Sequence, residues 1–293
     1  MKIKKLLAAN RSEIAIRIFR AAEESGIRTA AIYSKEDRFA LHRYKTDESY
    51  LVGEGKGPIQ SYLDINSIIK IAKEANVDAI HPGYGFLSES PEFADECEKN
   101  DIIFIGPNKD TLKKLGNKLE AKKVAQAVGI NIISSVSVLN QKESELKKEV
   151  DQIGYPVIVK ASWGGGGRGM RVVRSAEELS QQIELAQSES KKAFGKDEVF
   201  IEKFLEDAAH IEVQILGDKH GNIVHLYERD CSLQRRHQKI IERAPAHFLK
   251  ASSRESICSS AVKIAKHVNY CGAGTFEFLY DKKNNQHYFI EVN

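Results

Sequence analysis

The chain lacks the features that mark membrane, secreted and nucleic-acid-binding proteins. Its 293 residues contain no apolar run near the roughly 20 residues that a membrane span needs. The apolar part of its first segment is too short for a signal peptide. Lysine and arginine number 44 and aspartate and glutamate 41, and the resulting net charge of +3 is spread along the chain. So small an excess does not attract nucleic acid by itself. We therefore expect neither a membrane nor a nucleic-acid partner.

Cysteine is scarce, and its spacing excludes the common metal and redox motifs. The four cysteines are Cys97, Cys231, Cys258 and Cys271, and no two of them form a C-x-x-C pair. A zinc ribbon and a thioredoxin motif both need that pair. We expect reduced thiols in a reducing compartment. This predicts a cytoplasmic location, or the mitochondrial matrix in a eukaryote, although no transit peptide is seen.

The first third of the chain alternates predicted strands with predicted helices. Its apolar runs are short, and the segments between them show helical spacing. This alternation is typical of a parallel, Rossmann-like sheet, so we predict an α/β domain there. The predicted strands are residues 5–9, 29–33, 79–80 and 102–105, and the predicted helices are a segment capped by Ser12 and residues 65–75.

The rest of the chain predicts an α+β arrangement. Strands over 155–160 and 170–173 enclose a glycine-rich loop, and a capping box from Ser175 to Glu178 opens a helix. Further on, the pattern changes to antiparallel pairs. The predicted hairpins join residues 210–216 to 223–227 and residues 275–280 to 286–292, with a helix over 256–268 between them.

The glycine-rich loop predicts contact with phosphate. Gly164, Gly166 and Gly169 match G-x-G-x-x-G, but a strand follows instead of the helix that a dinucleotide fingerprint requires. A glycine-rich loop between antiparallel strands is typical of a flap over nucleotide phosphates, as in kinases. Glycines let backbone N–H groups approach oxygens closely, and Arg168 adds positive charge. A flexible hairpin without a ligand is the alternative.

Three further segments carry polar groups. Lys160 closes an apolar strand, which is costly unless its ammonium meets a phosphate or a carboxylate; a lysine that reaches the surface is the alternative. Residues 228–239 mix acids, bases and amides, which favours a compact anion site over a nucleic-acid face, with a solvated loop as the alternative. Residues 81–86 resemble a ligand loop at the carboxyl end of a parallel sheet, or a simple turn.

The last hairpin predicts a metal site. With its turn centred on residues 283–285, antiparallel pairing places Glu277 opposite Glu291, with Asn293 on the same face. Opposed Cβ atoms lie about 5 Å apart, and the repulsion between two carboxylates there is roughly 3 kcal/mol. A divalent cation, Mg²⁺ or Mn²⁺, that also touches ATP phosphates would offset this repulsion. A different register, or salt bridges to nearby lysine or arginine, is the alternative.

Together, these motifs resemble the biotin carboxylase domain of biotin-dependent carboxylases, an ATP-grasp fold. The resemblance covers residues 4–293, and residues 41–53 look more like pyruvate carboxylases than like acetyl-CoA carboxylase subunits. The motifs that carry it are residues 10–15, 81–88, 160–171, 228–239 and 274–278. The implied segments are a Rossmann-like biotin carboxylase N-terminal domain (1–112), a helical linker (113–133), an ATP-grasp lid with the flap (134–203) and an incomplete ATP-grasp C-terminal subdomain (204–293).

The resemblance also implies a role for each candidate residue. The implied ATP-binding residues are Lys118 and Lys160 for the phosphates, the flap of Gly164, Gly165, Gly166, Gly167, Arg168 and Gly169, the adenine hinge of Glu202, Lys203 and Leu205 through backbone and side chain, and His210 near the ribose. The implied catalytic residues are Gln234 and His237 on the phosphate side and Lys239 near bicarbonate. The implied metal ligands are Glu277, Glu291 and Asn293.

The implied reaction is the ATP-dependent carboxylation of biotin. Bicarbonate attacks the γ-phosphoryl group of ATP to give carboxyphosphate, which breaks down to CO₂ and phosphate. Phosphate then deprotonates the ureido nitrogen of biotin, and carboxybiotin forms. In pyruvate carboxylases another domain passes the carboxyl group to pyruvate, giving oxaloacetate. The implied partners are bicarbonate, a biotinyl carrier domain, a carboxyltransferase domain and, at full length, further copies of the chain in a homo-oligomer.

Three departures from the family keep other functions open. Ser12 stands where the family has glycine, Trp163 stands at a position of small residues or tyrosine, and the sequence stops at Asn293. The last departure predicts an incomplete piece that cannot carboxylate biotin alone. One alternative is the biotin carboxylase subunit of an acetyl-CoA or other acyl-CoA carboxylase. The others are an ATP-grasp ligase for a different carboxylate and a non-catalytic nucleotide-binding or oligomerisation module.

Overall fold

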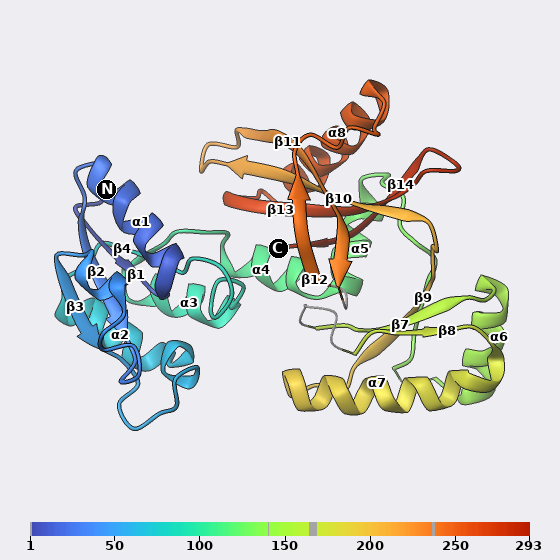
Figure 1. The fold of residues 1–293 in the computed structure, drawn as a ribbon, viewed down its shortest axis with the longest axis horizontal. Helices are drawn as coiled ribbons and strands as arrows, with labels where there is room; N and C mark the ends of the chain where they lie inside the picture. The colour runs from blue at the N-terminus through green and yellow to red at the C-terminus, as the bar shows by residue number, and fades with distance from the viewer. Residues whose placement is uncertain (1, 140, 164–168, 236–237) are drawn as a thin grey trace. The chain divides into compact units, whose positions relative to one another are not determined.

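The chain folds into two compact units, Met1–Lys113 (unit 1) and Lys114–Asn293 (unit 2) (Figure 1). The computed structural model describes residues 2–139, 141–163, 169–235 and 238–293. None of the helices in this described part is both long enough and apolar enough to span a bilayer. All four cysteines are free, and Cys97, Cys231 and Cys258 are buried.

Unit 1 contains a five-stranded parallel sheet in the order β3-β2-β1-β4-β5, which confirms the predicted Rossmann-like domain. Its strands are β1 (Lys5–Ala8), β2 (Arg28–Tyr33), β3 (Glu48–Leu51), β4 (Ala79–His81) and β5 (Ile103–Phe104). Its helices are α1 (Ser12–Glu24), α2 (Ile65–Glu74), α3 (Pro91–Lys99) and the start of α4 (Lys109–Gly116), with 3₁₀ turns η1 (Leu41–Tyr44) and η2 (Gln60–Leu63).

The sheet of unit 1 is buried on both faces because its strands carry apolar residues at consecutive positions. Leu6 packs with Phe19 of α1 on one face, and Leu7 packs with Ile68 of α2 and Phe93 of α3 on the other. This arrangement leaves the carboxyl ends of the strands to the loops, where parallel sheets bind their ligands.

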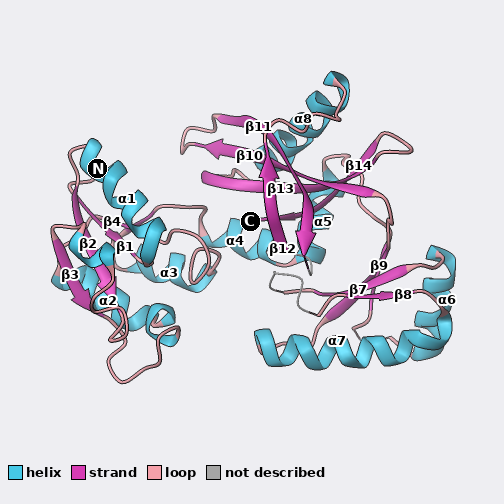
Figure 2. Ribbon diagram, in the orientation of Figure 1, coloured by secondary structure: helices cyan, strands magenta, loops and turns pink. Residues whose placement is uncertain are grey.

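Unit 2 contains two antiparallel sheets, and the smaller one has four strands in the order β6-β9-β7-β8. One face packs on α6 and α7, which bury apolar residues such as Leu146 and Leu179 against it (Figure 2). The elements are β6 (Ser135–Ser137), α6 (Glu143–Ile153), β7 (Val157–Ala161), β8 (Arg171–Val173), η3 (Ala176–Glu178), α7 (Leu179–Phe194) and β9 (Val199–Lys203).

The larger sheet of unit 2 has five antiparallel strands in the order β12-β11-β10-β13-β14. Helices α5 and α8 pack on its apolar face, where Ala125, Ile257 and Phe278 share one core. Together the two sheets confirm the predicted α+β arrangement. The elements are α5 (Lys118–Ala127), β10 (Ala208–Gly217), β11 (Ile223–Arg235), β12 (Gln238–Arg243), α8 (Ala251–His267), β13 (Gly272–Asp281) and β14 (Gln286–Val292).

Two predicted helix caps are wrong. Ser12 is the first residue of α1, and the preceding Arg11 is the N-cap without a side-chain hydrogen bond. The helix begins early because Asn10 holds the preceding loop, accepting from the Arg11 amide at 2.8 Å. Ser175 precedes the 3₁₀ turn η3 instead of α7, and its side chain makes no cap hydrogen bond. Glu178 instead accepts from the backbone amide of Arg174 at 3.3 Å.

The last hairpin reaches the predicted carboxylate pairing by a different register. Close to the turn, Asp281 pairs with Gln286 and Phe278 with Phe289, one residue away from the predicted register. The register then shifts, and Glu277 pairs with Glu291 as predicted. The extra residue is Ile290, so the shift is a β-bulge. Without this bulge, Glu277 would lie opposite Ile290.

Candidate functional site

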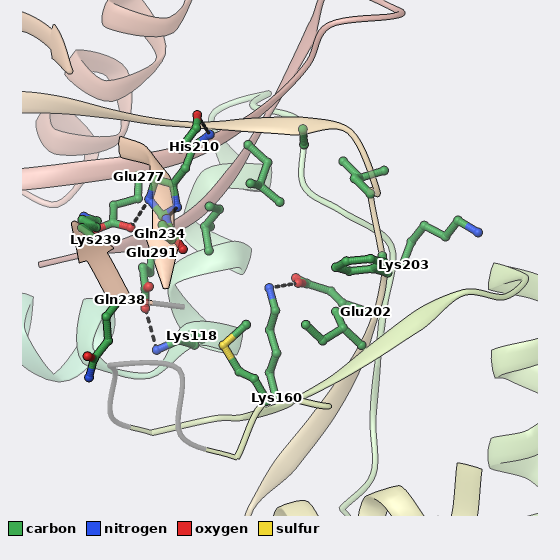
Figure 3. Close-up of a pocket in the computed structure, with 18 of the residues that line it drawn as sticks. Lys118, Lys160, Glu202, Lys203, His210, Gln234, Gln238, Lys239, Glu277 and Glu291 are labelled. Carbon is green, nitrogen blue, oxygen red and sulfur yellow. Dashed lines mark hydrogen bonds and ion pairs between the residues drawn. The ribbon is translucent and has the colours of Figure 1, made fainter. Parts of the chain in front are cut away.

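A cavity of about 570 Å³ lies within unit 2 between its two sheets (Figure 3). Strands β7 and β9 supply one wall, strands β10 to β14 supply the other, and the first turn of α5 adds Lys118. The side chain of Asn117 caps α5 by accepting from the Leu119 and Glu120 amides, which places Lys118 at the start of the helix. The cavity is thus built from segments far apart in the sequence.

The cavity gathers most of the candidate residues. Eleven of them line it: Lys118, Lys160, Glu202, Lys203, Leu205, His210, Gln234, Lys239, Glu277, Glu291 and Asn293. Gly169 is described, with a φ of +72°, and is not among the lining residues. The other flap residues, Gly164, Gly165, Gly166, Gly167 and Arg168, lie outside the described residues, as does His237.

One end of the cavity is rich in positive charge. Lys160 on β7 donates to Glu202 Oε2 on β9 at 2.5 Å, and Lys122 on α5 donates to Oε1 of the same carboxylate. The Glu202 side chain is only 1% exposed. We call Glu202, Lys122 and Lys160 the Glu202 cluster. One carboxylate lies between two ammonium groups there, so the cluster has an excess of positive charge that suits an anionic ligand.

Crowding weakens the hold of both lysines on their protons. Burial and the nearby ammonium groups of Lys160 and Lys118 lower the pKa of Lys122, while its ion pair with Glu202 favours the charged form. Burial also lowers the pKa of Lys160, to about 8, against the favourable charge of Glu291. An anion that enters the cavity would favour the protonated forms, since an opposite charge nearby raises the pKa of a lysine.

The other end of the cavity is rich in negative charge. Lys239 on β12 donates to Glu277 Oε1 at 2.6 Å and also pairs with Glu212. Asn293 donates to the same Glu277 oxygen at 2.7 Å, and His210 lies 2.5 Å from Oε2. We call Glu277, Glu212, Lys239, His210 and Asn293 the Glu277 cluster. Arg229 also pairs with Glu212, so the Glu277 carboxylate shares Lys239 with a carboxylate that has a second cationic partner.

Ion pairing sets the protonation of this second cluster. Burial alone raises the pKa of Glu277, but its contacts with His210 and Lys239 outweigh burial and lower this pKa to about 2. Burial lowers the pKa of Lys239, but Glu277 and Glu212 reverse that effect, so its pKa lies above the ordinary value. Glu277 and Lys239 are therefore both charged near neutral pH.

Gln234 orients His210. The Gln234 side-chain amide Nε2 lies 3.0 Å from His210 Nδ1 and donates to the Cys231 carbonyl at 2.9 Å. An amide N–H can only donate, so Nδ1 of His210 accepts and Nε2 carries the proton that faces Glu277. The resemblance implies that His210 lies near the ribose and Gln234 on the phosphate side, and the structure joins the two by a hydrogen bond.

The two opposed carboxylates of the last hairpin have separate cationic partners. Glu291 pairs with Lys118 Nζ at 2.6 Å, whereas Glu277 pairs with Lys239. Because of the bulge, Ile290 and Glu291 both face the cavity, and the flanking Phe289 and Val292 belong to the core. The repulsion between the carboxylates is thus offset by lysines, the alternative that the sequence left open. The predicted metal at this position remains a proposal.

The hinge between β9 and β10 offers backbone and apolar surface instead of polar side chains. The carboxylate of Glu202 is held by two lysines, and Lys203 points away from the cavity (Figure 3). Its ammonium donates to the carbonyls of Gly154 and Tyr155 at 2.9 and 3.0 Å. The apolar lining that a flat ring system could contact consists of Ile158, Met170, Phe204, Leu205, Leu279 and Ile290.

Sequence reasoning missed several residues of the site. Lys122 follows Lys118 by four residues, and helix geometry places both on one face, so this spacing was an available signal. Leu279 follows Glu277 by two residues and so shares its face of the strand. Gln238 and Ser232 also line the cavity. No sequence signal separated them from the other polar residues of their segment.

The charged run of residues 228–239 divides between structure and cavity. Glu228 is buried and pairs with Arg254 at 2.7 Å, and Asp230 pairs with Arg243 at 2.6 Å. These acids connect β11 to α8 and to β12, while the later members of the run reach the cavity. The predicted compact polar site therefore covers only the second half of the run.

Trp163, the departure next to the flap, is held by two charged neighbours. Its indole N–H donates to Glu198 at 2.7 Å, and the ammonium of Lys196 lies 3.6 Å from its ring centroid. In unit 1, the predicted ligand loop follows β4, and Asn10 donates to its Pro82 and Tyr84 carbonyls at 2.8 Å each. This loop has the predicted position at the carboxyl end of the sheet.

Known proteins match both units. Residues 2–112 match the family described as biotin carboxylase, N-terminal domain, and residues 117–293 match the carbamoyl-phosphate synthase L chain, ATP binding domain. The chain is 57% identical to the pyruvate carboxylase of Bacillus subtilis over 295 residues, covering 99% of this chain and 25% of that protein. It thus spans about a quarter of the length of such relatives.

Solved structures agree over the full chain. The pyruvate carboxylase of Rhizobium etli matches with a TM-score of 0.95 and 55% identity, covering 100% of this chain and 26% of that one. The biotin carboxylase domain of the 2-oxoglutarate carboxylase of Hydrogenobacter thermophilus matches with a TM-score of 0.96 and 45% identity, covering 100% of this chain and 64% of that one. That structure contains MgADP, ADP and bicarbonate.

The two-unit fold, the polar cavity of unit 2 and the matches to both units lead to one assignment. The chain belongs to the biotin carboxylase family, with a biotin carboxylase N-terminal domain followed by the ATP-grasp domain that it shares with the large chain of carbamoyl-phosphate synthase.

Proposed function

We propose that this chain takes part in the ATP-dependent carboxylation of biotin by bicarbonate, the first half-reaction of a pyruvate carboxylase. The observation that supports this most is the polarity of the cavity. A cation-rich cluster, an anion-rich cluster and a set of apolar side chains all line this one cavity. This is the arrangement that a nucleotide with a phosphate tail and a bound metal requires.

The phosphates of ATP would contact Lys118 and Lys160. Both lysines line the cavity, and in the structure each pairs with a carboxylate, Glu291 and Glu202. Lysine is a compact point charge that exchanges one oxygen partner for another without a change of geometry. The adenine would lie against the apolar wall and the backbone of the hinge, because the Glu202 and Lys203 side chains are already bonded elsewhere.

The oxygen donors of the anion-rich end fit Mg²⁺. Glu277 and Glu291 are paired residues on neighbouring strands. The side-chain N–H₂ of Asn293 donates to Glu277, which leaves its side-chain oxygen Oδ1 as a further metal ligand. Protein sites for Mg²⁺ use one or two carboxylates together with substrate phosphates. When bound, the metal would neutralise charge on the phosphates. Mn²⁺ has the same preference for oxygen.

Lys239 would orient bicarbonate, since its ammonium lies between Glu212 and Glu277 at the same end of the cavity. Bicarbonate attacks the γ-phosphoryl group, the bond to ADP breaks, and the carboxyphosphate that results gives CO₂ and phosphate. Phosphate removes the ureido proton of biotin, and the nitrogen then takes up CO₂. The contribution of this chain is to hold opposite charges in place before the reaction begins.

The same proposal includes the segments and partners inferred from the sequence. These are a lid over residues 134–203, a biotinyl carrier domain, a carboxyltransferase domain and a homo-oligomeric assembly. The identity to pyruvate carboxylases, 57% for that of Bacillus subtilis, favours pyruvate over 2-oxoglutarate, for which the matched carboxylase domain is 45% identical. An acyl-CoA acceptor is the remaining alternative.

The test is a coupled assay on the protein that carries this chain. ADP formation is measured with ATP and Mg²⁺ while bicarbonate, biotin and the acceptor are omitted one at a time. We expect ADP formation to require bicarbonate, and oxaloacetate to form only with pyruvate. Lys239→Met should abolish bicarbonate-dependent ADP formation, while MgATP still binds. MgATP binding without turnover would contradict the proposal and indicate a non-catalytic nucleotide-binding module. Carboxylation of acetyl-CoA would show that the acceptor is acetyl-CoA and not pyruvate.

A further inference from the structure

Glu202 has two lysine partners, and only one of them faces the cavity. Lys160 lines the cavity, whereas Lys122 is not among its described lining residues. The Lys122 side chain is 3% exposed, and its ammonium lies 5.0 Å from the centroid of the buried Phe200 ring. The two lysines thus hold the same carboxylate from opposite sides, one accessible to a ligand and one enclosed by protein.

A ligand that takes Lys160 changes the charge balance around Glu202. If Lys160 turns toward an anion in the cavity, it leaves Glu202 Oε2, the oxygen that it contacts at 2.5 Å. A buried carboxylate without a partner is strongly destabilising, because water cannot replace the lost interaction. Lys122 keeps its contact with Oε1, since nothing in its position depends on the ligand. Its ion pair therefore makes the movement of Lys160 possible.

We propose that Lys122 is a positioning residue: it is the permanent counter-ion of Glu202 and thereby frees Lys160 to bind the phosphates of a nucleotide. The proposal rests on the proposed function, which places phosphates at this end of the cavity. It assigns Lys122 a part in phosphate affinity although Lys122 does not reach the ligand. Lys118, four residues earlier on α5, serves the ligand directly.

Electrostatics within the cluster support this division. Burial, Lys160 and Lys118 lower the pKa of Lys122, and the ion pair with Glu202 opposes them by favouring the charged form. When Lys160 moves to a phosphate, its repulsion of Lys122 falls, and Lys122 holds its proton more firmly. Glu202 thus loses an ion pair at Oε2, and its ion pair with Lys122 at Oε1 becomes stronger. A neutral side chain of the same length at position 122 could not respond in this way.

The experiment compares ADP with adenosine as probes, by calorimetry on the full chain. The ratio of the two dissociation constants isolates the phosphate contacts, because both probes share the base and the ribose. In Lys122→Met, Lys160 must stay with Glu202, so we expect the preference for ADP to fall roughly 10- to 100-fold, the loss of one charged hydrogen bond. Lys122→Arg, which keeps the charge, should retain most of the preference.

A double variant separates this role from a general packing role. In Lys122→Met/Glu202→Gln the carboxylate that detains Lys160 is gone, so the preference for ADP should return to the wild-type value or exceed it. A preference that stays low in the double variant would overturn the proposal, even if the single variant does not fold. Lys123→Met is the matched control, because Lys123 is the next residue, is 70% exposed and pairs only with the exposed Glu120 among the described contacts.

Failure of this inference differs from failure of the proposed function. If the wild-type chain binds neither ADP nor ATP, the nucleotide assignment itself is wrong. If the wild-type chain prefers ADP to adenosine and Lys122→Met keeps that preference, the nucleotide assignment stands and the role of Lys122 is refuted. Equal losses of ADP and adenosine affinity would also refute it, since they indicate a packing defect.

Discussion

The two ends of the cavity are made from the same kinds of side chain in opposite proportions. In the Glu202 cluster one carboxylate lies between two ammonium groups, whereas in the Glu277 cluster the ammonium of Lys239 lies between two carboxylates. This difference shifts the pKa values of the lysines in opposite directions. The pKa of Lys160 is lowered to about 8, chiefly by burial, while the pKa of Lys239 is raised because two carboxylates outweigh burial.

This difference shows that the number of partners determines what a buried charge can do. A cluster in which two lysines share one carboxylate can give one lysine to an incoming anion, and a cluster in which two carboxylates share one lysine can give one oxygen to an incoming cation. Neither end needs an unpaired charge before a ligand arrives. The pair of Lys118 and Glu291 joins both ends, since phosphate would take the lysine and metal the carboxylate.

The largest effect is expected from removing the central charge of the anion-rich end. Glu277→Gln leaves Lys239 with Glu212 alone and removes one metal ligand. Truncation of one partner in a buried charge network costs about 2–5 kcal/mol, so Mg²⁺-dependent ATP affinity should fall at least roughly 30-fold. Titration of ATP with and without Mg²⁺ measures this loss. Glu255→Gln, at an exposed position on α8, is the control and should be silent.

The same carboxylate should make stability depend on acid pH. The pKa of Glu277 is about 2 in the folded chain, below its ordinary value of 4.5, so the folded state favours the charged form. The stabilisation, on the order of 3 kcal/mol, is complete above pH 4.5 and is lost as pH falls toward 2. Thermal unfolding between pH 6 and 3 should show the difference between wild type and Glu277→Gln shrinking with acid. A constant difference would contradict the ion-pairing account.

A smaller effect is expected at the link between the two ends. Glu291 is 22% exposed, whereas Glu202 and Glu277 are 1% and 3% exposed, so solvent screens the Glu291 carboxylate more than the other two. Glu291→Gln should weaken Mg²⁺-dependent ATP binding about tenfold, near 1.4 kcal/mol. Unchanged Mg²⁺ affinity would remove Glu291 from the proposed metal site. Glu120→Gln, on the exposed face of α5, is the matched control.

The smallest effect tests a residue that the family resemblance assigns to the adenine site. Lys203 points away from the cavity and donates to the carbonyls of Gly154 and Tyr155. Lys203→Met should therefore change adenosine affinity by no more than about twofold, the usual scale for a side chain outside a site. Calorimetry with adenosine is sufficient for this comparison. A tenfold loss would show that the side chain turns toward the base when a ligand binds.

Much of the fold could be predicted because local patterns agree with it. The alternation in the first third identified the parallel sheet, and the alternating strands of the last third identified the antiparallel one. Helix starts were less predictable, since Ser12 and Ser175 have the residue type of a cap without the contacts. A cap depends on how the preceding loop is held, and for α1 that loop is fixed by Asn10.

The candidate site shows the same limit more sharply. The predicted pairing of Glu277 with Glu291 is correct, but the predicted register near the turn is wrong by one residue. In the structure, the bulge at Ile290 shifts the register so that these two residues pair. No pattern in the strand marks that bulge. Lys160 was predicted to meet a phosphate or a carboxylate, and the structure pairs it with Glu202. The choice of Glu202 required a contact across 42 residues.

The sequence by itself determined the strand–helix alternation of the first third, the two antiparallel hairpins and the kinds of charge available, because these follow from local spacing and residue type. Only the tertiary structure decided which charges share a partner. Lys122 and Glu202 are 80 residues apart, and they meet because α5 and β9 converge in unit 2. Whether one carboxylate lies between two lysines, or one lysine between two carboxylates, depends on that convergence, since electrostatic interactions follow distance and burial in the folded chain.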